Sequence, residues 1–160
     1  KDDVLHDALL NSYRILSPRI YDFKKMMYTP GYAGEDFLNM DPYFISDKKK
    51  KEGICLSVKG LSNGAVAVLY PGVIKKLVEF MDGGFYVVFS SVHEALIYSS
   101  KLCSLEELEN LLRTSNARMT FQKEFLTDKV YYYCKEEDKF IMLRGSMKML
   151  VTTIRMDEEN

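Results

Sequence analysis

The order of the short apolar segments restricts the fold of this chain more than any other feature. Segments with strand character lie at residues 43–46, 54–59, 65–70, 85–89, 94–98, 130–134 and 140–143. Most neighbouring segments are separated by a turn alone, whereas parallel strands need a crossover of a dozen or more residues. The order therefore predicts an α+β fold with a largely antiparallel sheet, and it argues against a doubly wound parallel sheet.

Two stretches of the same region switch to helical spacing. The first lies within residues 71–81 and ends at Gly83-Gly84, which is typical of a helix C-terminus. The second follows Ser104, where Ser104-x-x-Glu107 forms a capping box ahead of a leucine stripe. We therefore expect two helices packed against the sheet.

The N-terminal residues have a different pattern. Apolar residues recur at helical spacing from Val4 to Leu16, and Ser17-Pro18 supplies start signals for a second helix from about Pro18 to Met27. Residues 28–42 contain two Pro and two Gly, which indicates a linker. The predicted organisation is a helical pair with its linker over 1–40, an α+β body over 41–156 and a solvated tail over 157–160.

The connections within the body carry turn signals. Residues 47–53 are charged and indicate a turn, and Ser62-Asn63-Gly64 predicts a hairpin between residues 54–59 and 65–70. Residues 135–139 form a charged loop between the last two predicted strands of the body. Residues 147–156 are expected to be a strand or a mobile end.

Composition excludes several classes of protein. The 160 residues carry 22 Lys plus Arg against 23 Asp plus Glu, so no global field attracts nucleic acid or an anionic membrane. No apolar run reaches the length of a membrane span. The three cysteines, Cys55, Cys103 and Cys134, show no C-x-x-C spacing and are expected to be reduced thiols. We expect a cytoplasmic protein without a cofactor.

Several motifs of this chain match the motifs of a known family in their order and spacing. They are Gly64-Ala65 with 69–73 (Leu-Tyr-Pro-Gly-Val), Ser90-Ser91-x-His93-Glu94, and 126–133 (Leu-Thr-Asp-Lys-Val-Tyr-Tyr-Tyr). The chain resembles a bacterial family of unknown function that occurs mostly in gut-dwelling anaerobes. Its members are longer, so the resemblance implies that this chain is a C-terminal portion, and it implies no reaction, cofactor or catalytic residue.

The one cluster that resembles chemistry is Ser90, Ser91, His93 and Glu94. A hydrolase would use His93 as base, a serine as nucleophile and Glu94 as the orienting carboxylate. Adjacent residues such as His93 and Glu94 do not project in one direction, so a linear relay is unfavourable. We favour a turn in which these side chains bind backbone groups. With only two histidines, His6 and His93, no set of metal ligands is apparent.

Two surface features could bind a partner. Lys48, Lys49, Lys50 and Lys51 give a local excess of positive charge that could contact phosphates, although a solvated turn is the simpler interpretation. Tyr131 and Tyr133 share one face of a predicted strand and would suit a protein partner if exposed.

The sequence favours a non-enzymatic interaction or ligand-binding module, whose partner is a protein or a small ligand. The alternatives are a hydrolase that uses the Ser90–Glu94 segment and a nucleic-acid contact through Lys48–Lys51, the latter disfavoured by the neutral charge of the chain. No membrane contact is expected, and the oligomeric state stays open.

Overall fold

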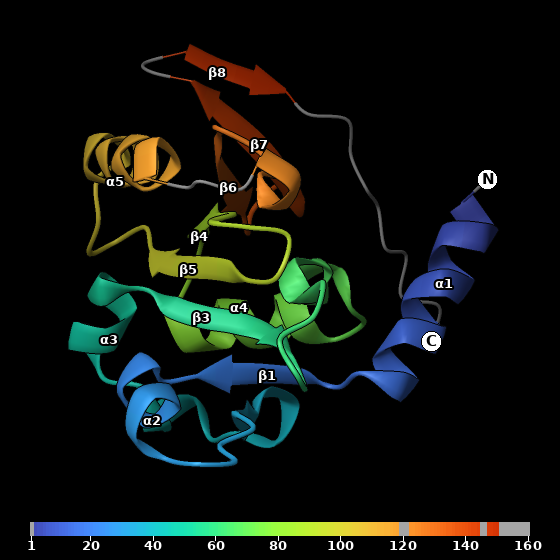
Figure 1. The fold of residues 1–160 in the computed structure, drawn as a ribbon. Helices are drawn as coiled ribbons and strands as arrows, with labels where there is room; N and C mark the ends of the chain where they lie inside the picture. The colour runs from blue at the N-terminus through green and yellow to red at the C-terminus, as the bar shows by residue number, and fades with distance from the viewer. Residues whose placement is uncertain (1, 119–121, 145–146, 151–160) are drawn as a thin grey trace.

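The computed structural model describes residues 2–118, 122–144 and 147–150. Among these residues, eight strands form one sheet in the order β2-β1-β3-β5-β4-β6-β7-β8, and every neighbouring pair is antiparallel (Figure 1). The strands are β1 (Pro18–Tyr21), β2 (Glu35–Asp36), β3 (Ile54–Val58), β4 (Phe85–Val88), β5 (Ala95–Ser99), β6 (Val130–Cys134), β7 (Lys139–Arg144) and β8 (Met147–Leu150). The predicted antiparallel α+β fold is confirmed.

Helices lie before, between and over these strands. The α-helices are α1 (Asp2–Ile15), α2 (Phe23–Tyr28), α3 (Asp47–Glu52), α4 (Val73–Met81) and α5 (Leu105–Arg118). Four short 3-10 helices are η1 (Phe37–Asn39), η2 (Pro42–Phe44), η3 (Gly64–Leu69) and η4 (Gln122–Glu124).

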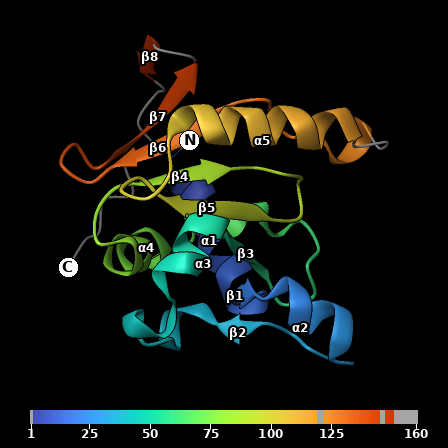
Figure 2. The ribbon, with the colours of Figure 1, turned by 90° about the vertical axis from the view of Figure 1, so that its left-hand side faces the viewer.

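Both faces of the sheet are covered. Adjacent strand residues point to opposite faces, so Val87 and Ile97 join a large core cluster with α4 and η3. Val88 and Tyr98 join a smaller cluster that includes Leu108 of α5. Figure 2 shows α4 and α5 on opposite sides of β4 and β5. The two helices predicted to pack on the sheet are confirmed.

The predicted N-terminal helical pair is half correct. Helix α1 is present, but the second helix expected from Pro18 to Met27 is wrong over its first half, because Pro18–Tyr21 is strand β1. Proline is tolerated as the first residue of a strand, and β1 pairs with β3 along its whole length. Helix α2 begins only after Asp22, whose side chain accepts the amides of Lys24 and Lys25. The pairing of β1 with β3 crosses the predicted boundary near residue 41.

The strand expected at residues 43–46 and the turn expected at 47–53 are also wrong. Pro42 is the first residue of the 3-10 helix η2. The side chain of Asp41, just before it, accepts a hydrogen bond from the Tyr43 amide. Ser46 caps α3, and ion pairs one helical turn apart link Lys50 with Asp47 and Lys48 with Glu52. These local contacts stabilise a helix, which the sequence analysis took for a turn because the segment is highly charged.

The hairpin predicted across Ser62-Asn63-Gly64 is wrong as well. Residues 65–69 belong to η3 instead of a strand, Tyr70 follows its end, and this segment packs over β3. Both edges of β3 are already paired, with β1 on one side and β5 on the other. The chain after β3 therefore has no open edge beside it and crosses the face of the sheet.

The remaining strands agree with the sequence. Segments 85–89, 94–98, 130–134 and 140–143 correspond to β4, β5, β6 and β7, and the last two form the expected hairpin. Part of the segment predicted as a strand or mobile end is β8. Residues 151–156 and the predicted tail at 157–160 lie outside the described residues.

Gly64, at the start of η3, lies where no side chain fits. A Cβ atom added there would lie 2.0 Å from Ser57 Oγ, and 2.7 Å from the His93 carbonyl oxygen and from the Val58 nitrogen. Ser57 Oγ donates to that same carbonyl oxygen at 2.6 Å. The close approach joins β3, η3 and the loop between β4 and β5.

We predict that Gly64→Ala lowers the free energy of unfolding by about 3 kcal/mol, because the new methyl group has to displace backbone atoms. Gly60→Ala is the matched control, since its Cβ would meet nothing within 4 Å and only its positive φ is unfavourable. We expect that control to lose about 1 kcal/mol. Urea unfolding of both variants measures the difference, and equal losses would contradict the steric explanation.

A second prediction concerns pH. The ion pair with Lys49, followed by the amide of Lys25, lowers the pKa of the Asp22 carboxyl to about 2. A depressed carboxyl pKa stabilises the folded state above the unfolded value, and this contribution disappears as pH falls through the folded value. Asp22→Asn keeps the helix cap but removes the charge, so it should lose roughly 0.5–1 kcal/mol at pH 7. Unfolding curves of the variant and the native protein should converge between about pH 4 and pH 2; a constant difference would refute the prediction.

Candidate functional site

The loop between β4 and β5 carries the Ser90, Ser91, His93 and Glu94 cluster. Ser90 Oγ donates to Glu94 Oε1 at 2.8 Å. Ser91 Oγ accepts the backbone amide of His93 at 3.0 Å, and Ser91 is 3% exposed. Both hydroxyls therefore bond within the loop. The turn interpretation predicted a backbone contact for Ser91, which is present. It predicted a backbone contact for Glu94 as well, but Glu94 binds the side chain of Ser90.

The imidazole of His93 faces two other segments. Its Nδ1 accepts the backbone amide of Asn63 at 3.1 Å, and its Nε2 lies 3.7 Å from Glu124 Oε1. Because Nδ1 is an acceptor, the neutral ring carries its proton on Nε2, directed toward Glu124. The ring thus connects the loop to the start of η3 and to η4.

This arrangement lacks the relay that a serine hydrolase needs. Among the described residues, no serine hydroxyl bonds to either ring nitrogen of His93. Glu94, the proposed orienting carboxylate, binds Ser90 and not the imidazole. The four candidate catalytic residues therefore lie in one loop but do not converge as nucleophile, base and orienting acid.

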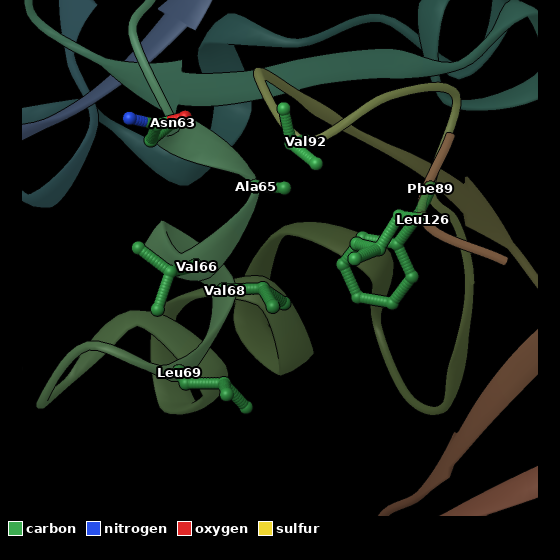
Figure 3. Close-up of a pocket in the computed structure, with 8 residues that line it drawn as sticks. All are labelled: Asn63, Ala65, Val66, Val68, Leu69, Phe89, Val92 and Leu126. Carbon is green, nitrogen blue, oxygen red and sulfur yellow. The ribbon is translucent and has the colours of Figure 1, made fainter. Parts of the chain in front are cut away.

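An apolar groove lies beside this loop. It has a volume of about 280 Å³ and is open to solvent. Its lining residues are Asn63, Ala65, Val66, Val68, Leu69, Phe89, Val92 and Leu126. Figure 3 shows η3 on one side of the groove and Phe89 with Leu126 on the other.

The walls of the groove are held by backbone hydrogen bonds. The Ala65 amide donates to the Val92 carbonyl oxygen at 3.2 Å, and the Val92 amide donates to the Glu124 carbonyl oxygen at 3.0 Å. Phe89 packs edge-on against Tyr131, with ring centroids 5.6 Å apart. The groove is therefore formed by three segments that are distant in sequence: η3, the β4–β5 loop and the chain after η4.

Apolar side chains remain exposed along this groove. Val66 is 38% exposed and Leu126 48% exposed, and the neighbouring Phe125 is 46% exposed. Sequence reasoning missed the groove, because it assigned residues 65–70 to a strand of a hairpin. The exposed position of Val66 follows from the 3-10 conformation and has no separate signal in the sequence.

The four consecutive lysines belong to α3, and most of their charge is matched locally. Lys48 and Lys50 pair within the helix, while Lys49 pairs with Asp22. The charge of Lys51 contributes to lowering the pKa of the Glu107 carboxyl, although the contacts of that carboxyl with Ser104 dominate. Little uncompensated positive charge is left for a phosphate backbone.

The two tyrosines proposed to bind a partner have different environments. Tyr133 is 5% exposed, stacks on Phe85 and donates from its hydroxyl to Asp138, so it is a core residue. It offers no surface to a partner, because the sheet face it occupies is the one covered by α4. Tyr131 is half-buried and supports Phe89 in the wall of the groove.

The cysteines and acidic residues form no metal-binding cluster among the described residues. All three cysteines are free, and burial, with a smaller contribution from Glu94, raises the pKa of the Cys55 thiol to about 12. No group of three His, Cys, Asp or Glu side chains in the described ranges could hold a metal ion. In the same ranges no helix has the length and apolarity to cross a bilayer.

Comparisons with known proteins add one match. Neither a search of curated proteins nor a search of solved structures found a similar chain. A family described as "Family of unknown function (DUF5688)" matches residues 1–135, which is most of the chain. This agrees with the resemblance to a family of unknown function, and its extent is decisive: the chain belongs to the DUF5688 family.

Proposed function

We propose that this protein is a non-enzymatic interaction module, and that the groove beside η3 binds an apolar side chain of a protein or peptide partner. The observation that carries the proposal is the groove itself, whose lining is apolar except for Asn63. Exposed apolar surface that is rimmed by polar groups is typical of binding sites.

The rim of the groove supports a peptide as the ligand. Asn63 is exposed at one end, and its side-chain amide offers both a donor and an acceptor, which suits a peptide backbone. Glu124 presents a carboxylate that is 45% exposed next to His93. The preferred ligand is therefore a large aliphatic or aromatic side chain, flanked by backbone amides that Asn63 can bind.

The size of the groove fits one such side chain. Burial of a leucine-sized group contributes about 2 kcal/mol, which corresponds to roughly 30-fold in affinity. One anchor of this kind gives a weak contact, so flanking residues such as Phe125 and Tyr131 would extend the interface. A cytoplasmic location for this interaction stays a prediction.

The two alternatives have less support. A hydrolase would need a serine hydroxyl next to the His93 ring, where the backbone amide of Asn63 is bound instead. A nucleic-acid contact would need free lysines, and three of the four consecutive lysines of α3, Lys48, Lys49 and Lys50, are paired with acidic side chains. Turnover of an ester or peptide panel that disappears in His93→Ala would support the hydrolase; salt-dependent binding that requires Lys48–Lys51 would support the nucleic-acid contact.

We predict that peptides selected from a random displayed library on the native protein share a large apolar residue. Their affinity should fall at least tenfold in Val66→Asp and in Leu126→Asp, because each variant places a charge in the groove. Isothermal calorimetry with one selected peptide measures the change.

Leu102→Asp is the matched control, because Leu102 is 37% exposed and Val66 38% exposed, and Leu102 lies outside the groove. It should bind the peptide as the native protein does. Selected peptides that bind both groove variants without loss, or a library that yields no binder, would overturn the proposal. Unfolding curves of all three variants establish that the losses do not come from misfolding.

A further inference from the structure

The imidazole of His93 is bound at both nitrogens by groups with opposite preferences. The backbone amide of Asn63 requires an unprotonated Nδ1, since an amide can only donate. The Glu124 carboxylate, 3.7 Å from Nε2, favours the charged ring. The two contacts therefore favour different protonation states of one side chain.

Protonation would change these contacts in a defined way. A charged ring carries hydrogen on both nitrogens, so two donors would face each other between Nδ1 and the Asn63 amide. The hydrogen bond to Asn63 would be lost, while the attraction to Glu124 would grow. Histidine is the side chain that ordinarily changes charge between pH 5 and 8.

The Asn63 contact bears directly on the groove. Asn63 lines one end of the groove and has left-handed backbone angles, with φ of 53°. Asparagine adopts this conformation more readily than most residues other than glycine, and a contact at its own amide fixes it further. The hydrogen bond to His93 supplies such a contact, and Val92, next to His93 in the chain, also lines the groove.

The other charged residues near the His93 ring do not take the place of Glu124 as its partner. Glu94, the neighbouring acid, accepts a hydrogen bond from Ser90 and contributes to raising the pKa of buried Cys55. Lys123, next to Glu124, is exposed on η4. Among described residues, Glu124 is the one carboxylate within 4 Å of a His93 ring nitrogen.

We propose that His93 is a proton-operated latch of the groove. The neutral ring holds Asn63 and keeps the groove formed, and the protonated ring releases Asn63 and turns toward Glu124. The effect on ligand binding rests on the proposed function above, whereas the latch itself is a property of the free protein. Loss of one hydrogen bond corresponds to about fivefold in the population of the formed groove.

The test follows methyl groups by nuclear magnetic resonance across pH 5–8, without a ligand. The methyl signals of Ala65, Val66 and Val92 should shift with the same midpoint as the His93 ring proton. The Asn63 amide proton should shift with that midpoint too, because it loses its acceptor. Only two histidines occur in the chain, so their ring signals are readily distinguished.

Variants separate the latch from a general effect of pH. His93→Asn keeps an acceptor oxygen near the position of Nδ1 but does not titrate, so its groove signals should stay constant in their neutral-pH positions. His6→Asn, on helix α1, is the matched control and should retain the native response.

The latch would be overturned if the methyl signals of the groove do not shift with the midpoint of the His93 ring proton. It would also be overturned if these signals still change with pH in His93→Asn. With a selected peptide, affinity should fall about fivefold from pH 7.5 to pH 5.5 in the native protein and remain constant in His93→Asn. The two proposals fail separately: titrating groove signals without any peptide binder refute the proposed function, whereas a binder with constant groove signals refutes the latch.

Discussion

Strand β3 has a partner on each edge and is buried along all five of its residues. This constraint shapes the rest of the site. The chain that leaves Val58 cannot pair beside β3, so it crosses the sheet face as η3. Gly64 permits the crossing at contact distance from Ser57 and the His93 carbonyl oxygen, where a methyl group would overlap both. The groove forms beside η3, because the chain crosses the sheet face there instead of pairing as a strand.

The polar residues of the β4–β5 loop are part of the same construction. Ser91 and the imidazole of His93 in this loop, and Ser57 in β3, each satisfy a backbone group, which accounts for the density of polar contacts here. The loop fixes Val92 and Phe89 at one wall of the groove, while the bond from the Val92 amide to Glu124 fixes the other segment. The groove has an apolar lining, and it is held together by hydrogen bonds that surround this lining.

Regular periodicity made a large part of the fold predictable. The stripe on α4 and the reciprocal Ser104–Glu107 cap of α5 led to helices that the structure contains, because local burial and local hydrogen bonds agree there. The same holds for the pairs β4–β5 and β6–β7, whose apolar runs are separated by short loops. At residues 42–52 the local caps and ion pairs were overlooked, whereas other failures were segments in which a short-range signal competed with the rest of the fold. Pro18 resembled a helix start, yet pairing with β3 made it a strand residue.

By itself, the sequence determined the α+β class, the largely antiparallel character of the sheet, the two covering helices and the composition of the polar loop. Only the tertiary structure decided that Tyr133 is core, that four residues of η3 line a groove, and that His93 binds Asn63 and Glu124 instead of a serine. The physical reason is sequence distance. Periodicity and capping report interactions within a few residues, whereas the groove depends on contacts among segments near residues 63, 92 and 124 that only the folded sheet brings together.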